Sequence, residues 1–246
     1  MPEIPGSSGY IQNKDVSLYY EVHQSTQDEA PILVLLHGNS EDMHIFDGHI
    51  EPLLPYYTVI TMDTRHQGRS SQGERPLSYE LFAEDLFVLI NKLLIGNCII
   101  MGFSDGAITA LELALKHPER ISAMVLVGPN ISPEGLTPAV RKSLQLYAAS
   151  KSIKRVFTKG ADNDKALIRL MLEHPHIDPH KLEKITTPIL IITGENDIIT
   201  KEHIQLMVTS LPKARWEQIS GATHFVMKDA PQTFDRIVLD FLMEDD

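Results

Sequence analysis

The amino-acid sequence predicts an α/β fold with a mostly parallel central sheet, helices on both faces and a short helical insertion. Apolar runs of strand length recur along the chain, patterns typical of amphipathic helices fall between them, and one segment interrupts the alternation. Most of these runs are apolar without a break, as expected for strands buried on both faces of a doubly wound sheet. We expect strands at residues 16–22, 32–36, 57–62, 98–101, 123–127, 189–193 and 214–219.

Length and composition restrict what this chain does. Its 246 residues suit one large domain, and 43% hydrophobic with 22% charged residues suits a globular core. The formal net charge of −11 repels phosphate backbones, so we expect no nucleic-acid partner. No apolar run approaches the roughly 20 residues of a membrane helix, so we expect no membrane partner. The first residues lack the features of a secretory signal, and we expect a cytoplasmic protein whose oligomeric state stays open.

Three core helices follow from local signals. Ser78 is a candidate N-cap, with Glu80 in the first turn and an apolar stripe behind it. A second helix is expected at residues 104–117, where Pro118 stops it, and a third at residues 232–243. The single cysteine, Cys98, lies in an apolar run and is expected to be a buried structural thiol.

Residues 131–187 form the predicted insertion, a helical cap between core segments 1–130 and 188–246. Breaks rich in Pro, Ser and Thr mark its borders, and its apolar spacing is helical. It carries ten Lys and Arg against six Asp and Glu, so it is basic while the rest of the chain is acidic. These cations either dock the cap on the acidic body or contact an anionic substrate; the candidates for contact are Arg141, Lys142, Lys151, Lys154 and Arg155.

The cap also contains three histidines, His174, His176 and His180. Pro175 and Pro179 break any helix there, and closing ligands for zinc are not identifiable, so we expect loop residues and no metal site.

The predicted strand at 98–101 runs into Gly102-Phe103-Ser104-Asp105-Gly106, and a helix follows. This is G-x-S-x-G in a strand, turn and helix, where glycines on both sides let a serine stand on a tight turn. Ser104 is therefore the candidate nucleophile. A serine hydroxyl needs a histidine to take its proton and a carboxylate to orient that histidine.

Both partners follow in the expected order. Asp197 comes just after the strand at 189–193, with Glu195 as its near rival, and His224 follows the last predicted strand. His37, directly after the strand at 32–36, is expected to be structural. The backbone amides of Asn39 and Asp105 are the candidate oxyanion hole, and Gly38 permits the turn between them.

Five motifs together resemble the serine α/β-hydrolases over nearly the whole chain. They are HGN at 37–39, DTRHQGRS at 63–70, GFSDG at 102–106, GEND at 194–197 and GATH at 221–224. In the second motif His66 stands where the family usually has Gly. The run beginning at Gly102 looks like the valacyclovirase (biphenyl-hydrolase-like) branch, whose elbow reads G-W-S-D-G-G-I-T-A-L.

The resemblance implies a role for Asp105. In that branch the aspartate after the nucleophile binds the α-amino group of amino-acid esters, and the alternative is that Asp105 only caps the elbow helix. Phe46, Phe103, Leu136 and Phe225 are either apolar walls of the substrate pocket or ordinary core residues, and Phe103 and Phe225 are next to the proposed catalytic residues in the sequence.

We therefore expect a cofactor-free and metal-free serine hydrolase that cleaves a carboxylic ester of a small molecule through an acyl-enzyme, with a preference for α-amino-acid esters as the finer hypothesis. A lactonase, thioesterase or carbon–carbon bond hydrolase would use the same machinery. A haloperoxidase activity would be a side reaction, and a serine nucleophile disfavours haloalkane dehalogenase and epoxide hydrolase chemistry. The alternative of another class is a noncatalytic ligand receptor on the same scaffold.

Overall fold

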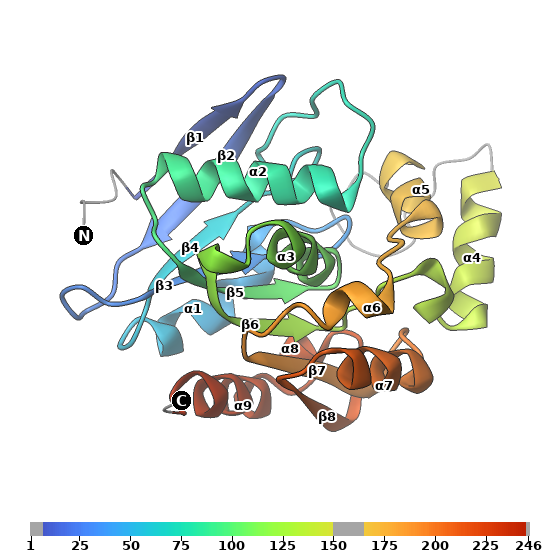
Figure 1. The fold of residues 1–246 in the computed structure, drawn as a ribbon. Coiled ribbons are helices and arrows are strands. Elements are labelled where there is room, and N and C mark those ends of the chain that lie inside the picture. The colour runs from blue at the N-terminus through green and yellow to red at the C-terminus, as the bar shows by residue number, and fades with distance from the viewer. Residues whose placement is uncertain (1–6, 150–164, 245–246) are drawn as a thin grey trace.

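The computed structural model describes residues 7–149 and 165–244. Its centre is an eight-stranded sheet with the strand order β1-β2-β4-β3-β5-β6-β7-β8 (Figure 1). Strands β1 and β2 pair antiparallel, as do β2 and β4, and all later neighbours pair parallel. The strands are β1 (Ser8–Asn13), β2 (Val16–His23), β3 (Ile32–Leu36), β4 (Thr58–Met62), β5 (Cys98–Phe103), β6 (Ile121–Val127), β7 (Ile189–Asn196) and β8 (Ala214–Thr223).

Two apolar cores lie on opposite faces of this sheet. In β3, Val34 and Leu36 belong to one core and Leu33 and Leu35 to the other, because successive side chains of a strand point to opposite faces. This explains the uninterrupted apolar runs. The first core packs against α2 (Tyr79–Lys92), α3 (Asp105–Lys116) and α7 (Lys201–Ser210), and the second against α1 (Asp47–Leu53), α8 (Val226–Asp229) and α9 (Pro231–Leu242).

The expected α/β-hydrolase fold class is confirmed, and most elements match within a few residues. Ser78 caps α2 by accepting a hydrogen bond from the Leu81 amide. The predictions missed β1, a hairpin partner of β2 with alternating burial, because its sequence SGYIQN has no apolar run. They also missed α1 and α7, short helices whose apolar stripes are narrow.

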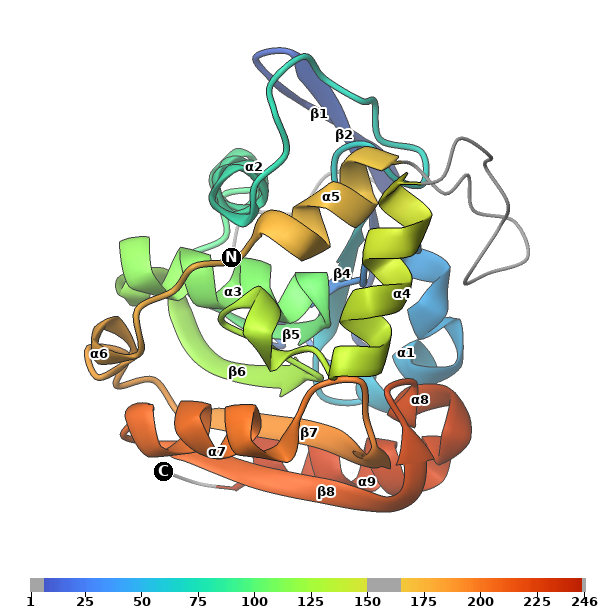
Figure 2. The same cartoon turned by 90° about the vertical axis from the view of Figure 1, so that its right-hand side faces the viewer.

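The segment between β6 and β7 contains α4 (Pro138–Ala149), α5 (Lys165–Glu173) and α6 (Pro179–Leu182). Helices α4 and α5 contact each other and lie beyond the carboxyl ends of the parallel strands (Figure 2). Three of the candidate cations, Lys151, Lys154 and Arg155, lie outside the described residues. Among the helices of the described chain, none has the length and apolarity needed to span a bilayer.

Candidate active site

Ser104 occupies a strained turn between β5 and α3. Its backbone angles, φ of 52° and ψ of −112°, lie in a region that residues other than glycine rarely adopt. The turn is tight, because a Cβ on Gly102 would collide with the backbone of Gly106 and Ala107, and a Cβ on Gly106 would collide with the Leu36 carbonyl. The glycines of the motif therefore let the turn close, and the turn places Ser104 at the carboxyl edge of the sheet.

His224 and Asp197 meet at this edge from two different loops. His224 Nδ1 donates to Asp197 Oδ1 over 2.7 Å, and both side chains are buried. Asp197 also accepts from the amides of Ile199 and Gly194. Burial alone would raise the pKa of Asp197, but the hydrogen bond and charge of His224 and the two amides hold it below its usual value. The carboxylate is thus an ionised partner that orients the ring and leaves Nε2 for another group.

Glu195, the rival of Asp197, lies in a different environment. It is exposed and accepts hydrogen bonds from the Gly221 amide and the Ser220 hydroxyl. These bonds hold the pKa of Glu195 below its usual value. Glu195 therefore holds the loop that leads to His224 in place, and it is Asp197 that accepts the hydrogen bond from the His224 ring.

His37 is fully buried beneath the loop that follows β3. Its Nε2 accepts from the Thr64 amide, which leaves Nδ1 to donate to the Gly38 carbonyl. Burial lowers the pKa of His37, so the neutral ring acts as a brace between two loops. A Cβ on Gly38 would press on the Phe103 ring and on Ser104, so a side chain there would disturb the elbow.

The backbone amides of Asn39 and Asp105 are the predicted donors of the oxyanion hole. Neither amide donates a hydrogen bond to any residue in the described part of the chain. Asp105 is the first residue of α3, where amide groups have no intrahelical acceptor and the helix dipole favours negative charge. Two such donors can hold an oxygen that becomes negative during acyl transfer.

The Asp105 carboxylate faces two protein donors. Its Oδ1 accepts from the Tyr79 hydroxyl over 2.8 Å and its Oδ2 from Asn39 Nδ2 over 2.9 Å. Burial raises the pKa of Asp105 to about 6, although the Asn39 and Tyr79 bonds oppose that rise. Asn39 Nδ2 also donates to the Leu167 carbonyl of α5, so the elbow, the candidate oxyanion loop and α5 share one network.

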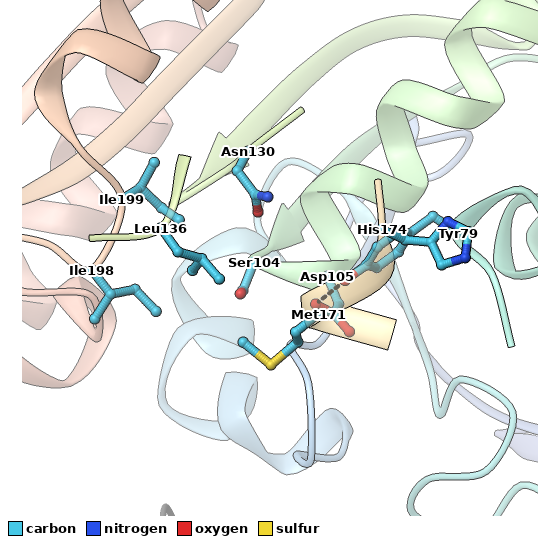
Figure 3. A pocket seen from close by; sticks show the side chains of 9 residues that line it. All are labelled: Tyr79, Ser104, Asp105, Asn130, Leu136, Met171, His174, Ile198 and Ile199. Carbon is cyan, nitrogen blue, oxygen red and sulfur yellow. Dashed lines mark hydrogen bonds between the residues drawn. The ribbon is translucent and has the colours of Figure 1, made fainter. Parts of the chain in front are cut away.

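Among the described residues, two cavities of unequal size are lined by Ser104. The larger one, about 80 Å³, is several times the roughly 10–15 Å³ that one water molecule needs, and Ser104, His224, Phe103, Phe225 and Glu41 all line it. The smaller one, about 10 Å³, lies between a group of Leu136, Ile198 and Ile199 on one side and Tyr79 with His174 on the other (Figure 3). A short acyl or alcohol group fits the larger cavity.

The structure brings together most of the residues expected at the site. Phe103, Phe225 and Leu136 line the two cavities, whereas Phe46 is fully buried in the second core and lines neither of them. Of the two roles considered for Phe46, the structure gives it that of a core residue and not of a wall of these two cavities. Of the described basic candidates, Arg141 pairs with Glu134 rather than with a cavity group.

Sequence reasoning missed five polar residues of the cavities: Tyr79, Asn130 and His174 of the smaller one, and Ser40 and Glu41 of the larger one. His174 was expected in a plain loop, yet it lines the smaller cavity with Tyr79 and Asp105. His176 lies beside His174, with 5.9 Å between ring centres, and His180 bonds Glu183 at the surface. No local motif marks these positions, because segments far apart in the chain bring them to Ser104.

Comparisons with known proteins agree with this architecture. Residues 31–152 match the family model of the alpha/beta hydrolase fold. A putative esterase/lipase of Haemophilus influenzae is 24% identical, with 92% of this chain and 88% of that protein covered. A putative carbamate hydrolase, RutD, of Pseudomonas savastanoi is 27% identical, with 92% and 98% covered.

Solved structures show the same fold. The enol-lactonase of Burkholderia xenovorans superimposes with a TM-score of 0.83 at 21% identity, over 96% of this chain and all of that one. The family match over residues 31–152, the sheet order and the serine on its tight turn lead to one assignment: the chain has the α/β-hydrolase fold.

Proposed function

We propose that the protein is a serine hydrolase that cleaves carboxylic esters of small molecules. The observation that carries this proposal is the 2.7 Å bond between His224 and Asp197 at the cavity that Ser104 lines from a positive-φ turn. Ser104 Oγ attacks the ester carbonyl while His224 Nε2 takes its proton, and the transfer requires the two groups to reach hydrogen-bond distance in the substrate complex. The Asn39 and Asp105 amides hold the oxyanion.

The tetrahedral intermediate collapses to the acyl-enzyme when the alcohol leaves, and water then hydrolyses the acyl-enzyme. His224 passes its proton to the alcohol oxygen as the carbon–oxygen bond breaks, and the alcohol leaves. Water next attacks the acyl carbon as His224 removes its proton, and the proton returns to Ser104 Oγ when the acid is released. Asp197 stays ionised and stabilises the imidazolium in both steps.

An ester is the substrate class that the site and the relatives jointly favour. A short apolar cavity suits a small neutral group, and a named relative is a putative esterase/lipase. A lactone, a thioester or a cleavable carbon–carbon bond would react through the same residues. We also propose that residues 131–187 act as the cap over this site, since α5 bonds Asn39 and lines the larger cavity through Ile168 and Met171.

The finer hypotheses, a valacyclovirase-like specificity and a preference for α-amino-acid esters, rest on Asp105. Its carboxylate is close to Ser104, but each oxygen already accepts a bond from a neutral donor. An ammonium group would therefore have to replace Tyr79 or Asn39 as a partner, and the preference stays a prediction.

The test compares wild type, Ser104→Ala and the exposed-serine control Ser143→Ala on ethyl propionate and alanine ethyl ester. We expect Ser104→Ala to lower kcat on the order of 10⁴- to 10⁶-fold with unchanged circular dichroism, and Ser143→Ala to match wild type. A fluorophosphonate should label wild type at Ser104 only. Full activity in Ser104→Ala would reject the assignment.

The ester pair separates the finer hypotheses. A higher kcat/KM for alanine ethyl ester supports amine recognition, and a higher value for ethyl propionate removes it. If wild type neither hydrolyses esters nor reacts with the fluorophosphonate, the noncatalytic receptor becomes the better interpretation.

A further inference from the structure

Glu41 is a buried carboxyl group on the wall of the larger cavity. It follows Asn39 and Ser40 in the loop after β3, and its side chain is only 9% exposed. It lines the cavity together with Ser104, His224 and Phe225, and the remaining lining is mostly apolar. Glu41 is therefore a carboxylate that a bound substrate would face.

One oxygen of the Glu41 carboxylate has no hydrogen-bond partner within the described residues. Its Oε1 is buried, and no donor within residues 7–149 and 165–244 comes within hydrogen-bond distance of it. Lys228 Nζ is 3.6 Å from this oxygen, which is an ion pair beyond hydrogen-bond length, and the Lys228 side chain is 54% exposed and lies over the Phe225 ring. Burial raises the pKa of Glu41 and Lys228 opposes that rise. A buried acceptor without a donor costs folding free energy, so we infer that a bound ligand supplies the missing donor.

The contrast with Asp105 shows which carboxylate is open to a ligand. Asp105 Oδ1 and Oδ2 already accept from Tyr79 and Asn39. Glu41 Oε1 has the Lys228 ammonium 3.6 Å away, slightly too long for a hydrogen bond, and no other donor among the described residues. Lys228 already provides a positive charge near Glu41, but Oε1 has no hydrogen-bond donor. A neutral hydroxyl group would donate that hydrogen bond and would not compete with the Lys228 ammonium.

We propose that Glu41 is a specificity-determining residue that accepts a hydrogen bond from a hydroxyl group of the substrate, so that the enzyme prefers short esters carrying a free hydroxyl. The inference rests on the proposed ester hydrolysis at Ser104. It assigns the substrate class as hydroxy esters, with the hydroxyl and the reacting carbonyl bound in the same cavity.

The experiment measures kcat/KM for matched esters. Ethyl lactate and ethyl propionate differ by a hydroxyl on the acyl side, and ethylene glycol monobutyrate and propyl butyrate differ at the alcohol side. Alanine ethyl ester and dimethylaminoethyl butyrate present a cation in each place. The variants are Glu41→Met, which removes the acceptor at similar volume, Glu41→Gln, which keeps a neutral acceptor, and Lys228→Met, which removes only the counter-charge.

We expect wild type to favour the hydroxy ester of at least one pair by roughly tenfold to a hundredfold, the size of a hydrogen bond to a charged group. Glu41→Met should remove this preference, Glu41→Gln should keep part of it, and Lys228→Met should keep it. A general effect of Glu41 on His224 would change both members of a pair equally, so the ratio isolates recognition.

Three results would overturn the inference. One is a hydroxyl preference that is absent in wild type or unchanged in Glu41→Met. Another is an equal loss in Lys228→Met, which would mean that the ion pair only positions the loop. The third is a preference for the cationic esters that depends on Glu41. Failure of the proposed function looks different, because wild type would then hydrolyse neither plain ester and would resist the fluorophosphonate.

Discussion

At the scale of single residues, Asp105 combines two tasks that follow from where it sits. Its amide is free at the first turn of α3, and its side chain is 3% exposed and bonded to Tyr79 and Asn39. The Tyr79 hydroxyl in turn has its pKa raised well above the usual value, by burial and by the neighbouring Asp105 charge. The carboxylate therefore holds the Asn39 side chain in place next to α5, and burial of its negative charge lowers the free energy of unfolding.

That buried charge makes stability depend on pH. The pKa of Asp105 rises from 3.8 in its ordinary state to about 6 in the folded protein. Between these values the folded chain binds more protons than the unfolded chain, so the stabilising contribution of this group is full below about pH 4 and falls as pH rises to about 6. We expect the unfolding free energy of wild type, relative to Asp105→Asn, to fall on the order of 2–3 kcal/mol over that range.

Urea denaturation at pH 4, 5, 6 and 7 measures this difference. Asp240→Asn, on the exposed face of α9, is the control and should track wild type. A pH-independent difference between wild type and Asp105→Asn would contradict the expected coupling.

At the scale of elements, the nucleophile turn depends on how closely α3 approaches β3 and β5. Gly106 lies against the Leu36 carbonyl, and Gly102 lies against the backbone at the start of α3. Parallel pairing of β3 and β5 brings these backbones together, with Leu36 opposite Gly102. The positive φ of Ser104 is maintained by this packing on both sides and would otherwise relax.

Gly106→Ala tests this packing. The added Cβ would meet the Leu36 carbonyl, so the backbone must shift. We expect a loss of about 1–3 kcal/mol in unfolding free energy and a fall in kcat on the order of a hundredfold, because small displacements of reacting groups are costly. Gly48→Ala in α1 is the control, since its Cβ meets nothing within 4 Å and a helical Gly→Ala change is neutral or stabilising. Equal behaviour of the two variants would refute the packing argument.

At the scale of the whole molecule, a buried ion pair ties the β1–β2 hairpin and α2 to the loop after β4. Arg65 is fully buried and donates Nε and Nη2 to the two oxygens of Asp85 over 2.6 and 2.8 Å. Asn13, at the end of β1, donates to the same carboxylate, and Asp15 lies 3.5 Å from Arg65. Because this loop also carries Thr64, the partner of His37, the pair connects the hairpin to the candidate oxyanion loop.

Asp85→Asn should destabilise the fold strongly. It leaves the buried Arg65 charge without its main partner, and removing one member of a buried pair costs about 3–5 kcal/mol. The adjacent control is Glu84→Gln, which breaks a surface pair with Arg75 and should cost less than about 1 kcal/mol. Chemical denaturation measures the unfolding free energy of both variants. Similar losses in the two would contradict the claim that burial makes the Arg65–Asp85 pair important for stability.

Much of the architecture could be predicted from the sequence because the signals are local. Continuous apolar runs indicate strands buried on both faces, Ser78 marks a helix start, and glycines around Ser104 indicate a tight turn. The order of Ser104, Asp197 and His224 along the chain also restricts which loops can meet at the sheet edge. Polar edge strands such as β1 lack such a signal, since half of their residues face solvent.

The sequence by itself determined the fold class, the strands of the parallel sheet and the three residues proposed for catalysis, because each depends on a short pattern. Only the tertiary structure decided that Asp197 rather than Glu195 bonds His224, that both oxygens of Asp105 are occupied, and that Glu41 lines the cavity with one oxygen that no described residue donates to. The physical reason is that hydrogen-bond partners and cavity walls come from segments well separated along the chain, by 26 residues for Tyr79 and Asp105 and by 128 for Asn39 and Leu167. Their meeting depends on how the whole chain packs.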